Sequence, residues 1–161
     1  MAKLTNITGD TVITLNLKVI SESPEWIGYE LIVFTNEDSE FKEFLRLHRE
    51  GHLYFDNFTE PEIPALCYSL YSIAYGQTES YTFTPIDEKD FYLKITPSNN
   101  NNYYSVSLFL NTAIVLKTSV WNSYSMPGLC MNVNKENIIT FSNELKREYE
   151  DMFLPKLLTT K

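Results

Sequence analysis

The sequence predicts an α+β domain spanning residues 1–161, built mainly of antiparallel β-sheet, with a central amphipathic helix and a C-terminal helix packed on it. Three observations support this class. Alternating apolar residues open the chain, a strongly signalled helix follows, and a series of strands then leads to a closing helix. This order favours an antiparallel sheet over βαβ units. With 161 residues and 43% hydrophobic content, the chain is long enough to bury one core.

Two strands are predicted at the start, joined as a hairpin. In the first, every second residue is apolar: Ile13, Leu15, Leu17 and Val19. This is the period of a half-buried strand. The second, Trp26–Thr35, is rich in residues that favour strands.

The segment 38–51 is ambiguous. Phe41, Phe44, Leu45 and His48 recur at helical spacing, and Gly51 would end a helix. Residues 41–47 also nearly alternate, and residues 53–55 could then be the return strand of a hairpin that turns at 50–51. We favour the helix here.

The central helix is predicted between Thr59 and Gly76. Thr59 and Glu62 form a capping box, and Pro61 lies in the first turn, where its missing N–H costs little. Gly76 is expected to end the helix. The buried face would consist of Ile63, Leu66, Cys67, Leu70, Ile73 and Ala74.

Further strands are expected at 80–83, 91–96, 103–110 and 113–121, with a polar loop at 99–102. A short strand at 138–141 would precede a last helix that begins at Ser142 as its N-cap and ends at Pro155. Its buried stripe would be Leu145, Tyr149, Met152 and Phe153.

The charge is distributed unevenly. Residues 22–90 hold fifteen carboxylates against four basic residues, a net of −11 within a chain of net −8. Between Pro97 and Asn134 the only charged residue is Lys117, which indicates buried sheet. The asymmetry favours a basic protein partner. A nucleic-acid partner is not expected, because phosphates would be repelled and no basic stripe offsets this.

The chain has no apolar leader and no run of about 20 apolar residues, so we expect a cytoplasmic protein with no membrane partner. Its oligomeric state is not predicted. Cys67 and Cys130 share no metal-type spacing and are expected to be two thiols rather than a disulfide.

No catalytic, metal or cofactor site is predicted. His48 and His52 lie in the sequence HREGH, but the metalloprotease motif requires a Glu directly after the first His, where Arg49 stands. Neither a nucleophile elbow nor a phosphate-binding glycine loop is present. Paired carboxylates could support an enzyme only within a cleft that strongly raises the pKa of one of them. We therefore expect no enzyme.

Two features indicate binding. Tyr68, Tyr71 and Tyr75 line one flank of the central helix, and tyrosine is enriched at interface hot spots. Acidic residues flank that helix in sequence, where they would steer a cationic partner. The predicted partner-binding residues are thus these tyrosines with Asp56, Glu60, Glu62, Asp87, Glu88 and Asp90.

Three segments resemble the WapI-type immunity proteins, small bacterial cytosolic proteins that neutralise a polymorphic toxin. They are Trp26–Thr35, the helix around Glu62–Leu66, and Ile139–Leu145 running into the closing helix. The resemblance implies a non-enzymatic protein that occludes a toxin domain. The loop 99–102 and the segment 120–131 have no counterpart in that pattern.

The combined hypothesis is an immunity or antitoxin-like inhibitor that binds a basic toxin domain through an acidic, tyrosine-bearing surface. The alternative is a small-ligand carrier with an apolar cavity between sheet and helix.

Overall fold

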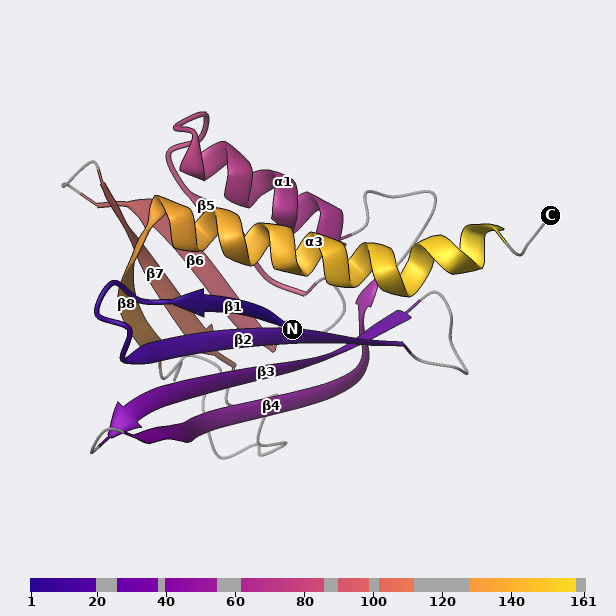
Figure 1. Ribbon diagram of the computed structural model, residues 1–161, viewed down its shortest axis with the longest axis horizontal. Helices are drawn as coiled ribbons and strands as arrows, with labels where there is room; N and C mark the ends of the chain where they lie inside the picture. The colour runs from indigo at the N-terminus through magenta and orange to yellow at the C-terminus, as the bar shows by residue number, and fades with distance from the viewer. Residues whose placement is uncertain are drawn as a thin grey trace.

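The computed structural model describes residues 1–19, 26–37, 40–54, 62–85, 90–98, 102–111 and 128–158. Within these ranges the chain forms two four-stranded antiparallel sheets and two helices (Figure 1). The first sheet has the order β1-β2-β3-β4, with bounds Ala2–Thr5, Thr11–Val19, Trp26–Glu37 and Glu40–Tyr54. The second has the order β5-β6-β7-β8, with bounds Tyr81–Phe83, Phe91–Pro97, Tyr103–Leu110 and Gly128–Asn134. The helices are α1, Glu62–Ala74, and α3, Lys135–Leu158.

The predicted fold class is confirmed, with two sheets in place of one. Each half of the chain is an up-and-down series of four strands followed by a helix. The two helices pack against each other and lie together along one side of the sheets (Figure 1). The predicted strands at the start of the chain are present as β2 and β3, which pair from Thr11↔Thr35 to Val19↔Ile27.

The helix favoured for 38–51 is wrong, because these residues belong to the long strand β4. Neither does the hairpin alternative hold, since β4 continues through Gly51 to Tyr54. A bulge at Phe44 explains the misleading spacing, and a second bulge lies further along the strand. Phe44 is an extra residue between the pairs Phe34↔Glu43 and Val33↔Leu45, and residues 50–52 lie opposite Gly28 alone. The single extra residue at Phe44 shifts the alternation of the strand, whereas the two extra residues of the second bulge leave it in phase.

The central helix is confirmed as α1. Gly76 adopts φ 70, and the chain ends the helix with two reverse hydrogen bonds. The N–H of Gly76 donates to the carbonyl of Ile73 at 2.9 Å, and the N–H of Gln77 donates to that of Ser72 at 2.8 Å. This is a Schellman arrangement, in which glycine avoids the steric cost of the left-handed conformation. The predicted capping residues Thr59, Glu60 and Pro61 lie outside the described residues.

The C-terminal region differs from its prediction. Residues 138–141 are not a strand, and Ser142 is not an N-cap, because both belong to α3. The N-cap is Asn134, whose Oδ1 accepts a hydrogen bond from the N–H of Asn137 at 2.7 Å. The preceding strand β8 was not predicted, and α3 continues past Pro155 to Leu158. The strand expected at 113–121 lies outside the described residues.

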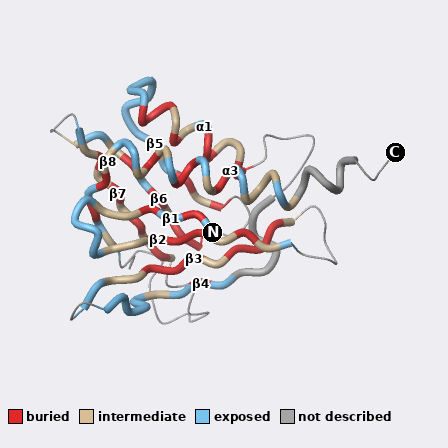
Figure 2. The backbone as a smooth tube through the Cα atoms, in the orientation of Figure 1, coloured by how far each residue is buried: buried red, intermediate tan, exposed pale blue. Residues whose placement is uncertain are grey.

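One hydrophobic core joins the sheets and helices (Figure 2). The first sheet contributes Ile13, Leu15 and Leu31, α1 contributes Leu66 and Leu70, and the second sheet and α3 contribute Phe91, Val106 and Phe141. One polar contact crosses this core. The hydroxyl of Tyr29 on β3 donates to Oδ2 of Asp90 at 2.7 Å, and both residues have 0% exposure. A buried carboxylate requires such partners.

Helix α3 also covers an edge of the first sheet. The backbone N–H of Lys3 donates to Oε2 of Glu144 at 2.9 Å, and that of Leu17 donates to Oε1 of Glu148 at 2.9 Å. These carboxylates take the place of a neighbouring strand. At the far end of β1 the two sheets meet, where the N–H of Ile7 donates to the carbonyl of Asn132 at 2.9 Å.

None of the described helices is both long and apolar enough to cross a membrane.

Candidate functional site

The predicted acidic surface does not form from the residues that the structure describes. Glu62 is 5% exposed and Asp90 is 0% exposed, so neither carboxylate lies on an open surface. Asp90 lies within the core between the sheets, where it accepts the Tyr29 hydroxyl. The other predicted acidic residues lie outside the described residues: Asp56, Glu60, Asp87 and Glu88.

The predicted tyrosines do lie along one flank of α1. Tyr68 is 71% exposed and Tyr75 is 60% exposed. The ring of Tyr71 stacks on that of Tyr75 with centroids 6.3 Å apart, and its hydroxyl donates to Oδ1 of Asn143. Nζ of Lys135 lies 4.1 Å from the Tyr75 ring centroid. The cation that contacts the Tyr75 ring is therefore Lys135 of the same chain, in the place where a cationic partner was expected.

The outward sides of the two sheets differ in chemistry. We call the outward side of the first sheet face A and that of the second sheet face B. Both are defined by the residues that alternate with the core residues along the paired strands. Face A comprises Lys3, Thr5, Val12, Thr14, Asn16, Lys18, Trp26, Gly28, Glu30, Ile32, Phe34, Asn36, Phe41, Glu43, Arg46 and His48. Face B comprises Thr82, Tyr92, Lys94, Thr96, Tyr103, Ser105, Ser107, Phe109, Gly128, Cys130, Asn132 and Asn134.

Face A is an interlocked network of charges centred on Glu30. Oε1 of Glu30 lies 2.6 Å from Nη1 of Arg46, and Oε2 of Glu30 lies 4.0 Å from Nζ of Lys18. Arg46 also contacts Glu43, through its Nη2. Nζ of Lys18 lies 3.2 Å from Nδ1 of His48. Burial acts to raise the pKa of Glu30, but hydrogen bonds from Arg46 and Asn16 and the nearby positive charges outweigh it and hold that pKa below its ordinary value. The charges of Glu30, Arg46, Glu43 and Lys18 are thus paired with one another.

Face B is arranged in rows across its strands. The pairing Tyr92↔Phe109↔Gly128 forms an aromatic row, Lys94↔Ser107↔Cys130 a middle row, and Thr96↔Ser105↔Asn132 a polar row. Consecutive rows are two residues apart, or about 6.6 Å along a strand. The three rows span three strands.

The aromatic row is built around a glycine. A Cβ on Gly128 would lie 2.5 Å from Cδ1 of Phe109, so the Phe109 ring occupies the space above this glycine. Glycine at this position allows the ring to lie close to the backbone of the neighbouring strand. Both aromatic residues of the row, Tyr92 and Phe109, are partly exposed.

No Asp or Glu is present among the residues of face B, and its one charged residue is the exposed Lys94. In a chain of net charge −8, this is a distinct electrostatic environment. Aromatic rings, hydroxyls, amides and a lysine can stack on planar groups, donate hydrogen bonds and neutralise an anion. Face B is therefore the candidate site.

The sequence contained a signal for face B that was interpreted differently. The almost uncharged stretch 97–134 indicates buried sheet, and that holds for one side of the two described strands within it, β7 and β8. In β7, Tyr104, Val106 and Leu108 are buried, while the residues between them are partly exposed. An uncharged strand can therefore have a solvent face of hydroxyls and rings.

The remaining predicted chemistry gives no second site among the described residues. Cys67 and Cys130 are free thiols, as expected, and burial raises the pKa of Cys67 to about 11. Cys67 contacts Ser142 across the two helices, where Oγ of Ser142 donates to the Cys67 carbonyl at 3.2 Å. Within the described ranges, no group of three or more His, Cys, Asp or Glu residues is placed to hold a metal.

No family model matches the chain, and no curated protein matches it. Among solved structures, the chain is similar to WHY3 from Arabidopsis thaliana, with a TM-score of 0.50 and 8% sequence identity. The match covers 99% of this chain and 95% of that one. At this identity, the likeness shows a shared fold.

This finding corrects two predictions. The solved structure that shares the fold is WHY3 and not an immunity protein, so the comparison contradicts the predicted immunity function and its toxin partner. The exclusion of a nucleic-acid partner is overturned by the same match. It rested on the overall charge of the chain, which conceals the composition of face B.

Proposed function

We propose that this protein binds single-stranded nucleic acid on face B, and that it acts as a binding protein and not as an enzyme. The observation that carries the proposal is that, among the residues the structure describes, no carboxylate belongs to this aromatic, hydroxyl-rich sheet face in an otherwise acidic chain. The fold shared with WHY3 supports the same class of ligand.

The rows of face B suit an unpaired strand. Bases that are not stacked in a duplex can stack on aromatic rings presented by a sheet, as other four-stranded sheet domains do with RNA. Tyr92 and Phe109 provide these rings, and Ser107 and Asn132 lie within reach as hydrogen-bonding groups. A duplex keeps its bases stacked and has a higher charge density, so the acidic body of the protein disfavours it.

Electrostatics predict an unusual salt dependence. Each phosphate neutralised by a basic side chain lowers the logarithm of affinity by about 0.7 per decade of salt for single strands. Face B has one such side chain, Lys94. We therefore expect a log–log slope of about −0.7, far shallower than that of basic nucleic-acid-binding proteins.

The test is fluorescence anisotropy with a labelled oligothymidylate at low salt. Lys94→Glu places a negative charge in the middle row and should weaken binding about tenfold or more. Lys42→Glu is the matched control, because it makes the same charge change at an exposed strand position of the first sheet. It should bind as the wild type does.

Two results would overturn the proposal. One is the absence of wild-type binding to any single strand at low salt. The other is an equal loss in both variants, which would show that overall charge and not face B controls binding.

A further inference from the structure

The C-terminal end of α1 is fastened to the start of β7, beside face B. The Tyr104 hydroxyl donates to the carbonyl of Ala74 at 3.2 Å and lies 3.4 Å from that of Ile73. The neighbouring residue, Tyr103, belongs to face B and pairs with Asn134 at the end of β8. The end of face B and the end of α1 are therefore held together by adjacent residues.

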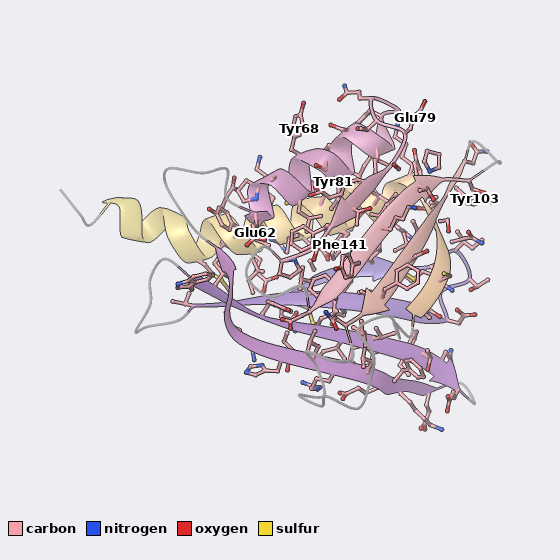
Figure 3. All side chains as sticks on the ribbon, turned by 180° about the vertical axis from the view of Figure 1, so that it is seen from behind. Glu62, Tyr68, Glu79, Tyr81, Tyr103 and Phe141 are labelled. Atoms are coloured by element: carbon pink, nitrogen blue, oxygen red, sulfur yellow. The ribbon has the colours of Figure 1, made fainter. Side chains whose placement is uncertain are left out.

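Next to this junction lies an open aromatic stripe, which we call the tyrosine ladder: Tyr68, Tyr71, Tyr75 and Lys135. The Tyr75 ring contacts both the Tyr71 ring and the Lys135 ammonium group. Tyr68, seven residues earlier, is about 10 Å along the helix axis from Tyr75. Figure 3 shows that Tyr68 projects from α1 away from the sheets. Tyr103 lies toward the same end of the molecule as Glu79 in that view.

We propose that a single strand bound on face B continues past the end of β8 onto the tyrosine ladder. An unpaired base stacks on the open ring of Tyr68, and the ammonium group of Lys135, held in place over Tyr75, contacts a phosphate. This inference rests on the proposed function of face B. It identifies the ligand as an extended unpaired strand, longer than the roughly 23 Å that the seven residues of β8 can span.

The local charges limit how the ladder can act. Glu79 and Glu136 are also exposed, and Glu136 is the neighbour of Lys135 in the chain, so the lysine does not give this end of the molecule a net positive charge. Stacking must therefore contribute more of the contact energy than phosphate binding does. Alanine in place of a stacking ring costs on the order of fivefold to 150-fold in affinity per base.

The experiment measures affinity for a length series of oligothymidylates with the wild type, Tyr68→Ala, Tyr68→Phe and Lys135→Gln. Because Tyr68 is largely exposed, its replacement should leave the fold intact. Tyr68→Ala should lose about fivefold or more for long strands and nothing for short ones. Tyr68→Phe keeps the ring and should match the wild type, and Lys135→Gln should make the long-strand salt slope shallower by about 0.7.

The outcomes separate the two proposals. If short strands bind normally and neither Tyr68→Ala nor Lys135→Gln changes the affinity for long strands, the tyrosine ladder is not part of the binding site. The proposed binding on face B would be unaffected by that result. The absence of binding at every length would refute face B itself. As a direct check, strands substituted with iodouracil should photocrosslink to the peptide that contains Tyr68, and only when they are long.

Discussion

Face A and face B lie on similar four-stranded sheets, yet a network of paired charges lies on face A and a single charged residue lies on face B. On face A, the side chains of Glu30, Arg46 and Lys18 neutralise one another. On face B, Lys94 is the single charge, and it stands in a row with Ser107 and Cys130. A ligand at face A would have to break existing ion pairs. Local composition, and not the total charge of the chain, therefore decides where an anion can bind.

The sharpest test of this comparison removes one aromatic ring from each face. Tyr92→Ala on face B should lower affinity for single strands by about 1–3 kcal/mol, since a stacking ring is lost. Phe34→Ala is the counterpart on face A, where a partly exposed ring is also removed. Anisotropy titrations should show no change for Phe34→Ala. Equal losses would mean that the two faces do not differ in function.

The contact between the sheets should matter for stability and not for binding. Tyr29→Phe deletes the hydroxyl that donates to Asp90 and leaves a buried carboxylate short of one hydrogen bond. We expect the free energy of unfolding to fall by about 1–3 kcal/mol, as measured by urea denaturation. Affinity for single strands at face B should remain that of the wild type. A stable Tyr29→Phe protein with weakened binding would contradict this division.

A smaller effect is expected from the glycine of the aromatic row. Gly128→Ala would force the Phe109 ring to move, because the new Cβ would lie within 2.8 Å of two of its atoms. Binding should weaken by several-fold, roughly the lower end of the value for a stacked base. Gly9→Ala is not a suitable control, because Gly9 has φ 76 and a side chain there would strain the backbone. Lys42→Glu is therefore again the control variant. Unchanged affinity with a displaced Phe109 ring would exclude that ring from the site.

The smallest effect is expected on face A. Arg46→Gln removes the main partner of Glu30, whose pKa lies below its ordinary value of 4.5. A lowered pKa contributes stability above about pH 4.5, and this contribution disappears as the pH falls through the folded-state pKa. Urea midpoints for wild type and variant should therefore differ slightly at neutral pH and converge in acid. A difference that grows in acid would contradict the assignment.

Regular alternation and capping chemistry made much of the fold predictable. The strands around Leu15 and Val106 and the helix that ends at Gly76 followed from local residues alone. The prediction failed at β4, because the bulge at Phe44 interrupts its alternation and imitates helical spacing. It failed again at α3, where Ile138 and Phe141 belong to the helical stripe that continues at Leu145.

The candidate site was less accessible to sequence reasoning. Face B becomes visible only when β6, β7 and β8 are aligned in register, since each strand contributes one or two residues to a row. The tyrosines of α1 were identified, but the lysine beside them comes from a helix sixty residues later in the chain. Contacts between distant segments set the chemistry of both places.

The carboxylates of α3 that cover the first sheet also have a consequence for synthesis on the ribosome. The Lys3 and Leu17 amides bond to side chains 141 and 131 residues further along the chain. The earliest strands therefore emerge long before the helix that completes their edge. Until α3 emerges, the nascent first sheet presents an uncovered edge, which other chains or chaperones can contact. Emergence of α3, and not completion of the first sheet, is the step that ends this exposure.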